Sequence, residues 1–243
     1  MKINKKKTVI LTGGSSGIGK SISYFLSSKG YLVLNLDIKK NFHNKIKFIK
    51  CDLSKVEQIQ SKSKLFENKN YKIISLINCA GITIPKNSLK YRYADWKKTL
   101  AINLTAPFFL SQLVANIMIK QKTKGSIINI TSISAELAMP DNPAYNSSKA
   151  GLKHLTKSLA VDLSKYNIRV NNISPGYTKS LMNNKSWNDR RLRKKRSERN
   201  LMKRWANTNE YNEAVLFLID SNKSSYMTGS DLIIDGGWIV KGL

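Results

Sequence analysis

Short apolar runs rich in β-branched residues recur along the whole chain, separated by polar or glycine positions. Most of them are apolar throughout rather than alternating, which is typical of strands buried on both faces of a parallel sheet. The runs that we expect to form strands are Thr8–Thr12, Leu32–Asp37, Lys47–Cys51, Ile73–Asn78, Ser126–Thr131, Arg169–Ile173 and Leu232–Ile234.

Longer stretches with helical character lie between these runs. The clearest are Gly17–Lys29, Trp96–Lys120, Tyr145–Ser164 and Glu210–Leu218. Strands that alternate with helices predict a parallel sheet, and right-handed crossovers then cover both of its faces. We therefore expect one α/β domain over residues 1–243: a Rossmann-type doubly wound parallel sheet of about seven strands. Ligands of such sheets bind at the carboxyl ends of the strands.

Composition supports a globular protein, since 41% of the 243 residues are hydrophobic and 23% are charged. No apolar run approaches the ~20 residues that cross a bilayer. The apolar stretch Val9–Leu11 behind the basic N-terminus is too short for a signal peptide. We expect a cytoplasmic protein with no membrane partner.

The charge is strongly positive, with 42 Lys and Arg against 15 Asp and Glu, or +27. Such a balance raises the question of nucleic acid. However, the basic residues run from Lys2 to Lys241 without the aromatic interleaving that stacks bases, so we do not expect a nucleic-acid partner. Only Lys185–Arg204 is concentrated, with ten basic residues.

Metal chemistry has no support in the sequence. Cys51, Cys79, His43 and His154 are isolated and lack the spacing of metal ligands or of a disulfide framework. We expect neither a metal site nor a disulfide.

A glycine-rich turn, Thr12–Gly19, joins the first strand to the first helical stretch. Glycines let a backbone turn sharply and approach a pyrophosphate, and the helix N-terminus offers free N–H groups. A plain structural turn is the alternative, but the place of this turn in the first βαβ unit favours a dinucleotide.

Asp37 closes the second strand, eighteen residues after Gly19. A carboxylate there accepts hydrogen bonds from the adenosine ribose and repels a 2′-phosphate, which favours NAD over NADP. Lys39 and Lys40 follow immediately and soften that repulsion, so NADP remains possible.

Tyr145 and Lys149 lie four residues apart in an expected helix, so their side chains share one face. An ammonium stabilises a phenolate, and we expect Lys149 to lower the pKa of Tyr145 from its usual ~10. Such a phenol suits proton transfer in carbonyl and alcohol chemistry. Ser132, thirteen residues before Tyr145, is a candidate to hold the substrate oxygen, and Ser134 competes for that role. Alone, Tyr-x-x-x-Lys occurs in many helices by chance.

Taken together, the motifs resemble those of the short-chain dehydrogenase/reductase family over nearly the whole chain. They follow in the family's order: Thr12-Gly13-x-x-x-Gly17-x-Gly19, Asp52-Leu53, Asn78-Cys79-Ala80-Gly81, Asn103, the set Ser132, Tyr145 and Lys149, Pro175-Gly176 with Ser180, and Asp235-Gly236-Gly237-Trp238. Cys79 departs from the family, which has a second Asn at this position.

The resemblance implies a role for each matching residue. Tyr145 is then the general acid/base, Lys149 lowers its pKa and holds the nicotinamide ribose, and Ser132 orients the substrate oxygen. Asn103 holds a water that links Lys149 to solvent, although a packing role for this asparagine is the alternative. The residues implied to bind the cofactor are Gly13, Ser15, Ser16, Gly17, Ile18, Gly19, Asp37, Asp52, Leu53, Asn78, Ala80, Gly81, Tyr145, Lys149, Pro175, Gly176 and Ser180.

The substrate is expected to meet residues 177–208 and the Ser134–Pro143 loop. The first segment is long, polar and rich in Arg and Lys, with Trp187 and Trp205 near its ends. It favours a polar, anionic substrate such as a sugar acid or sugar phosphate, because Arg suits carboxylates and phosphates. A solvated helix with its charges outward is the alternative. The substrate-binding candidates are Ser132, Ser134, Tyr145 and Trp187.

The resulting hypothesis is an NAD(P)(H)-dependent oxidoreductase that acts on a secondary alcohol or its ketone, with NAD preferred. A 3-oxoacyl-thioester reductase of the same family is the alternative, and a catalytically silent dinucleotide-binding regulator is the non-enzyme alternative. The resemblance also implies a homotetramer or dimer, with Leu100–Ile119 and Gly237–Leu243 at the interfaces.

Overall fold

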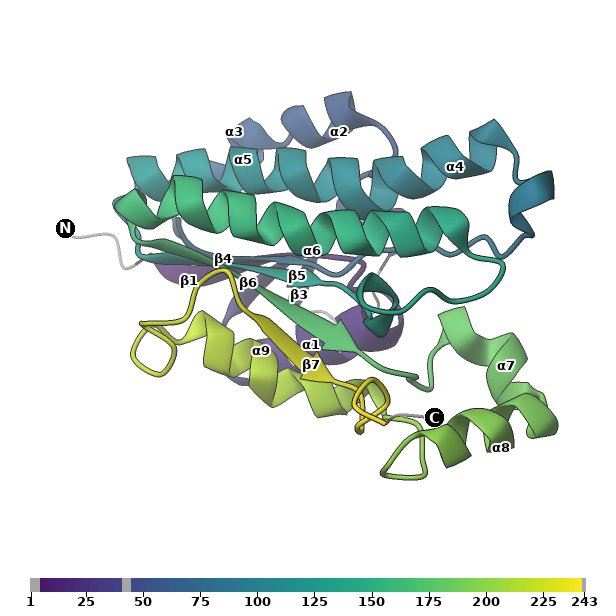
Figure 1. Ribbon diagram of the computed structural model, residues 1–243. Coiled ribbons are helices and arrows are strands. Elements are labelled where there is room, and N and C mark those ends of the chain that lie inside the picture. The colour runs from purple at the N-terminus through teal and green to yellow at the C-terminus, as the bar shows by residue number, and fades with distance from the viewer. Residues whose placement is uncertain (1–4, 41–44, 242–243) are drawn as a thin grey trace.

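A parallel sheet of seven strands forms the centre of the computed structural model, which describes residues 5–40 and 45–241 (Figure 1). The strands lie in the order β3-β2-β1-β4-β5-β6-β7. Their bounds are β1 Lys6–Thr12, β2 Leu32–Asp37, β3 Ile46–Lys50, β4 Tyr71–Asn78, β5 Gly125–Ile130, β6 Ile168–Pro175 and β7 Asp231–Ile234. All seven predicted strands are present, with ends that differ from the prediction by no more than two residues. The expected fold class is confirmed.

Helices cover both faces of the sheet, and each face has its own apolar core. Neighbouring residues of one strand alternate between the two cores: Ile10 packs with Leu110 of α5, whereas Val9 packs with Ile22 of α1. The longer helices are α1 Gly17–Ser28, α4 Tyr93–Leu100, α5 Ala106–Lys120, α6 Pro143–Leu163, α8 Arg190–Arg199 and α9 Asn212–Ile219. The shorter ones are α2 Val56–Gln60, α3 Ser63–Phe66 and α7 Asn184–Asn188.

The segment predicted as one helix from Trp96 to Lys120 has three parts. A π-helical turn, Ala101–Thr105, separates α4 from α5, and the Ala106 amide binds the carbonyl of Ala101, five residues back. Pro107 explains why the α-helical pattern breaks here, since it has no amide hydrogen for the carbonyl of Asn103 four residues earlier.

The helical run 93–120 is long and apolar enough to cross a membrane by length and composition. Half of its most apolar window is buried inside the protein. It therefore packs as a core helix of this fold.

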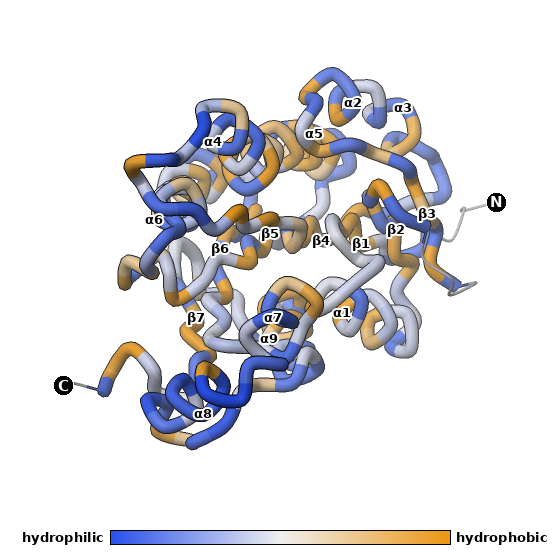
Figure 2. Tube along the Cα trace, turned by 90° about the vertical axis from the view of Figure 1, so that its right-hand side faces the viewer, coloured by the Kyte–Doolittle hydropathy of each residue, from blue (hydrophilic) through white to orange (hydrophobic). Residues whose placement is uncertain are grey.

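Helices α7 and α8 lie away from the two layers, at the end of the molecule where β6 and β7 finish (Figure 1). Their blue colour in Figure 2 contrasts with the orange strands of the sheet. Helix α8 is stabilised at its start by Asp189, whose side chain accepts a hydrogen bond from the amide of Leu192. These two helices belong to residues 177–208, which we call the substrate segment.

Candidate active site

The glycine-rich turn, residues 12–19, is so tight that side chains do not fit at several of its positions; we call it the cofactor turn. Gly13 has φ +74°, and a Cβ there would lie 2.8 Å from the Ala80 Cα. A Cβ on Gly19 would lie 2.3 Å from the Gly13 carbonyl oxygen. Ser16 takes the N-cap position of α1, and no side chain caps the first amides of this helix. The turn thus leaves backbone donors and close-approach space, which fit a pyrophosphate.

Two polar residues of β2 hold the cofactor turn from one side. Asn35, fully buried, accepts a hydrogen bond from the Gly14 amide (2.8 Å) and donates one to the Ser15 hydroxyl (3.1 Å). Asp37 accepts hydrogen bonds from the amides of Ser15 and Lys39, both at 3.1 Å. The sequence analysis missed Asn35. Its signal was an asparagine in the middle of the apolar run Leu-Val-Leu-Asn-Leu.

A hydroxyl joins the turn to the next strand of the sheet. Thr12 Oγ1 accepts hydrogen bonds from the amides of Cys79 and Ala80, each at 3.0 Å. Gly81 follows, and a Cβ at that position would lie 3.5 Å from the Lys149 Nζ. The backbone of Gly81 therefore lies beside the Lys149 ammonium, which is itself buried.

Tyr145, Lys149 and Ser132 come together at the carboxyl end of β5. The Ser132 hydroxyl hydrogen-bonds the Tyr145 phenol and also accepts the amide of Ser134 at 3.1 Å. Lys149 lies one turn below Tyr145 on α6, with Nζ 5.7 Å from the centre of the phenol ring. Its Nζ donates to the carbonyl of Ile130 at 2.7 Å. Ser132, rather than Ser134, is thus the hydroxyl that meets Tyr145.

The electrostatics of this trio differ from the expectation. Burial raises the pKa of Tyr145 above its usual value, the hydrogen bond from Ser132 lowers it in part, and the nearby Tyr177 raises it. Burial also lowers the pKa of Lys149 to about 8. The predicted lowering of the Tyr145 pKa by Lys149 is wrong, because desolvation of the phenol outweighs the other effects and the ammonium is directed at a backbone carbonyl.

Asn103 lies in the π-helical turn and is fully buried. Its amide nitrogen donates to the Ile82 carbonyl (2.9 Å) and to the Ser148 hydroxyl (3.1 Å), and its Oδ1 accepts the Ile82 amide (2.9 Å). The side chain thus fixes the loop that follows β4 to α6.

Several expected cofactor residues contribute through packing or backbone rather than an exposed side chain. Asn78 is buried and donates to Ser111 and Asn129. Leu53 and Ile18 belong to the apolar clusters on the two faces of the sheet. Asp52 accepts the amide and hydroxyl of Ser54, which lower the pKa of its carboxyl group.

The loop after β6 closes the site from the other side. Gly176 packs against Asp235, where a Cβ would come within 2.6 Å of the Cα, and its amide binds the Ile234 carbonyl. Ser180 lies beside the cofactor turn, since a Cβ on Gly17 would be 3.6 Å from the Ser180 Cβ. An open cavity of about 630 Å³ is lined by these two residues and by residues of α1 and α7, and Tyr145 is not among its lining residues.

An aromatic cluster joins the substrate segment to Ser132, Tyr145 and Lys149, which we call the candidate trio. Tyr177 packs its ring 5.1 Å from that of Trp205 and 4.7 Å from that of Trp238. Trp187 lies at the outer edge of the cluster, 5.5 Å from Trp205. Because Tyr177 acts on the pKa of Tyr145, the cluster lies within electrostatic reach of the reacting groups.

Three arginines of α8 stack on this cluster at helical spacing. The guanidinium of Arg196 lies 4.5 Å from the centre of the Tyr177 ring, that of Arg193 5.0 Å from Trp187 and that of Arg199 5.0 Å from Trp238. The sequence left open whether the basic residues of the substrate segment face only solvent. Three of its arginines instead lie over aromatic rings. One face of α8 covers aromatic rings, and the face with Arg191 is exposed.

Within residues 5–40 and 45–241, no group of three His, Cys, Asp or Glu side chains is arranged to hold a metal ion. His43 lies outside the described residues.

Comparisons with known proteins agree with this geometry. A family model described as Enoyl-(Acyl carrier protein) reductase matches residues 13–239. The chain is 37% identical to 3-oxoacyl-[acyl-carrier-protein] reductase FabG of Buchnera aphidicola subsp. Schizaphis graminum, covering 98% of each protein. It is 33% identical to L-xylulose reductase of Caenorhabditis elegans, covering 96% of this chain and 95% of that protein.

Among solved structures, 4-hydroxyisoleucine dehydrogenase complexed with NADH superposes with a TM-score of 0.93 at 32% identity, covering 98% of this chain and 100% of that one. A mutant of that enzyme, complexed with NADH and succinate, also gives a TM-score of 0.93.

Proposed function

The chain belongs to the short-chain dehydrogenase/reductase family, and on that premise we propose that it interconverts a polar, anionic hydroxy compound and its ketone with NAD(H). It is an NAD(P)-dependent oxidoreductase that acts on CH–OH groups or the corresponding carbonyls. The observation that carries the proposal is the Ser132–Tyr145 contact beside an aromatic cluster on which arginines are stacked. The substrate class, the preference for NAD and the residue roles are the parts that need testing.

In the proposed mechanism the protein handles the proton, while the nicotinamide supplies or accepts the hydride. The Ser132 hydroxyl holds the substrate oxygen, and the Tyr145 phenol donates a proton to it during carbonyl reduction. The raised pKa of Tyr145 keeps the phenol protonated at neutral pH, which suits this direction. During alcohol oxidation the deprotonated Tyr145 oxygen accepts the proton of the substrate hydroxyl.

Lys149 has two tasks in this scheme. With a pKa of about 8 it carries a charge at neutral pH, where it holds the nicotinamide ribose and takes part in the proton relay to Tyr145. A water on the main-chain carbonyl of Asn103 would link Lys149 to solvent, so that the proton that Tyr145 gives up in carbonyl reduction is replaced from solvent. The π-helical turn supports this role because Pro107 offers that carbonyl no amide hydrogen.

A preference for NAD(H) rests on Asp37. Its carboxylate already braces the cofactor turn through the Ser15 amide, at the end of β2 where an adenosine ribose is expected. A 2′-phosphate there would meet a fixed negative charge. Lys39, whose backbone amide also binds Asp37, tempers the repulsion.

An anionic substrate is proposed because of Arg196. A guanidinium stacked on a ring keeps its in-plane N–H donors free for a carboxylate or phosphate. Arg196 stacks on Tyr177, which lies within electrostatic reach of Tyr145. The relative solved with succinate is a mutant of a dehydrogenase of similar structure, which is consistent with carboxylate binding in this fold.

A 3-oxoacyl-thioester reductase is the second candidate. The 37% identity to an acyl-carrier-protein reductase favours it. The polar and basic substrate segment favours the first candidate, since a thioester chain needs an apolar channel.

The test is a turnover screen with NADH and NADPH over sugar acids and other hydroxy or keto acids, neutral polyols, and a 3-oxoacyl thioester. We expect acids to turn over with NADH. In Arg196→Met, the KM for the acid should rise roughly 10- to 100-fold, the loss expected for a charge-assisted hydrogen bond. Arg191→Met, on the exposed face of the same helix, is the matched control. Turnover of the thioester alone, with no effect of Arg196→Met, would support the second candidate.

We further propose a cytoplasmic homotetramer or dimer. Exposed apolar side chains support an interface, including Val161 on α6 (77% exposed) and Val240 near the C-terminus (73% exposed). Light scattering after size-exclusion chromatography tests it: Val161→Lys should shift an oligomer towards smaller species, and a monomeric parent protein would refute the proposal.

A further inference from the structure

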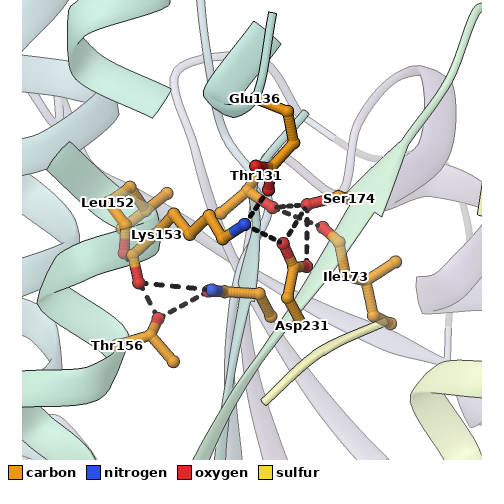
Figure 3. A network of polar contacts seen from close by, with 9 residues as sticks. Thr131, Glu136, Leu152, Lys153, Thr156, Ile173, Ser174 and Asp231 are labelled. Atoms are coloured by element: carbon orange, nitrogen blue, oxygen red, sulfur yellow. Dashed lines mark hydrogen bonds and ion pairs between the residues drawn. The ribbon is translucent and has the colours of Figure 1, made fainter. Parts of the chain in front are cut away.

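A partly buried polar network lies directly behind the strand end that carries Ser132. Figure 3 shows Lys153 of α6 between two carboxylates, those of Glu136 and Asp231. The Asp231 contact is 3.4 Å, and Asp231 is only 11% exposed. This triad has no counterpart in the reaction scheme above.

The network continues from Asp231 back to the strand end. The Ser174 hydroxyl of β6 donates to Asp231 at 2.7 Å and lies 2.5 Å from the hydroxyl of Thr131 (Figure 3). The backbone amide of Thr131 donates to the Ile173 carbonyl at 2.8 Å, and the Thr131 hydroxyl donates to that of Ser174. Elements β5, β6, β7 and α6 are therefore tied together by one chain of contacts.

This chain of contacts is a closed ring around Ser132. Residues 131–136, which follow β5, form one side of the ring. The contacts begin at Thr131, one residue before Ser132, and return at Glu136, four residues after Ser132. Within the segment, Ser132 is the residue that meets Tyr145. The ring thus grips the segment on both sides of the hydroxyl.

The same ring fixes α6, which carries the other two reacting side chains. Tyr145, Lys149 and Lys153 repeat every four residues and so share one face of this helix. Lys149 is fastened to the carbonyl of Ile130, and Lys153 is fastened to Glu136. Two successive lysines of α6 therefore bind the strand end on either side of Ser132.

We propose that Glu136, Lys153 and Asp231 are positioning residues that set the distance between the Ser132 hydroxyl and the Tyr145 phenol. The inference rests on the roles given above to Ser132 and Tyr145. Reacting groups lose rate steeply when their separation changes, and a remote misplacement of 1 Å can cost ~10²-fold. Lys153 also removes the cost of burying Asp231, because a charge with so little exposure needs a partner.

The main variant is Glu136→Gln, which removes the charge and keeps the shape. We expect kcat for carbonyl reduction to fall roughly ten-fold, less than the full loss for a 1 Å misplacement, while NADH affinity stays unchanged. Glu67→Gln is the matched control, since it breaks the exposed Glu67–Lys120 pair (2.9 Å) away from the site. It should leave kcat unchanged.

A double-mutant cycle separates positioning from general structural support. If Glu136 acts through Ser132, Glu136→Gln should cost nothing further in a Ser132→Ala protein. Equal losses in both backgrounds, or an unchanged kcat in Glu136→Gln, would overturn the proposal.

A spectroscopic readout keeps the test independent of any substrate. Tyrosinate absorbance in pH jumps, taken as wild type minus Tyr145→Phe, reports the titration of Tyr145, which faces Ser132, Lys149 and Tyr177. The hydrogen bond from Ser132 lowers the pKa of Tyr145, so Glu136→Gln should raise that pKa, and should not do so in the Ser132→Ala background. No shift in Glu136→Gln refutes the positioning role. A shift with no turnover on any compound refutes the proposed reaction instead.

Discussion

The cofactor turn and the substrate segment meet at Gly17 and Ser180, yet they are built from different materials. The turn is made of backbone: Gly13 and Gly19 approach other main-chain atoms so closely that a methyl group is excluded. The substrate segment is made of long side chains, arginines stacked on aromatic rings at 4.5 to 5.0 Å. The first region tolerates little variation, whereas the second can change its specificity by exchanging side chains on an unchanged helix.

Between the two regions lies the candidate trio of Ser132, Tyr145 and Lys149, to which we assign the catalytic roles and which belongs to neither region. Its geometry depends on α6 and on the end of β5, and its chemistry depends on burial. Substitutions in the three places should therefore differ in size and kind: turnover for the trio, cofactor affinity for the turn, and substrate choice for the segment.

The largest effect is expected for Tyr145→Phe. Loss of the phenol hydroxyl removes the proton donor, so turnover should fall ~10²- to 10⁴-fold while NADH affinity is nearly unchanged. Steady-state rates and nicotinamide fluorescence measure the two quantities. Tyr166→Phe, an exposed tyrosine after α6, is the control. Substantial residual activity in Tyr145→Phe would exclude it as the acid/base.

A backbone substitution in the cofactor turn should come next. Gly19→Ala brings a Cβ to 2.3 Å from the Gly13 carbonyl oxygen, which forces the turn to move. Overpacking of this kind costs about 1–3 kcal/mol, and we expect NADH affinity to fall by roughly 10- to 100-fold. Gly30→Asn, at an open position with φ +86°, should cost stability but not affinity. Wild-type NADH affinity in Gly19→Ala would contradict the backbone account of this region.

A smaller, selective effect is expected at Asp37. Asp37→Ala should weaken NADH by about ten-fold, typical for a lost charged hydrogen bond, and should leave NADPH unchanged or tighter. Asp37→Asn keeps one acceptor for the Ser15 amide but removes the charge. It therefore distinguishes the effect of the charge on cofactor affinity from the effect of holding the cofactor turn. Titrations with NADH and NADPH give the ratio of the two affinities. An unchanged ratio in both variants would remove Asp37 from its role.

The smallest effect is a gain in stability from Lys149→Met. The folded-state pKa of Lys149, about 8, lies below its ordinary 10.5, so the buried ammonium opposes folding. This opposition is fully present below pH 8, shrinks as the pH rises and vanishes above 10.5. We expect Lys149→Met to be about 1–2 kcal/mol more stable at pH 7, measured by urea unfolding, with the gain lost near pH 11. A pH-independent difference would argue against a buried charge.

Much of the fold and of the turn could be predicted from the sequence because their causes are local. Unbroken apolar runs require burial on two faces, and the spacing from Gly13 to Gly19 permits a tight turn. The choice of Ser132 over Ser134 came instead from the resemblance to the family, whose spacing of thirteen residues to the tyrosine Ser132 matches.

The rest depends on contacts that no local pattern carries. Spacing put Lys149 near Tyr145 but did not give the burial that raises the pKa of the phenol. The spacing of Arg193 and Arg196 places them on one face of a helix, but it does not show that aromatic rings lie under this face. The role of Glu136 depends on a lysine seventeen residues later and on Asp231 in the last strand.

The way in which the substrate segment leaves and rejoins the sheet has a thermodynamic consequence. Thr178 pairs with Ala206 as an isolated parallel bridge, and the Ala206 amide and carbonyl bind Tyr177 and Lys179 at 2.9 Å. A long excursion is thereby closed into a loop at its base. Closing a loop lowers the entropy of the chain when the protein folds, and this entropic cost increases only slowly with the length of the loop. A ligand that binds against this loop therefore meets a preorganised segment. Little of its binding free energy is lost in ordering the chain.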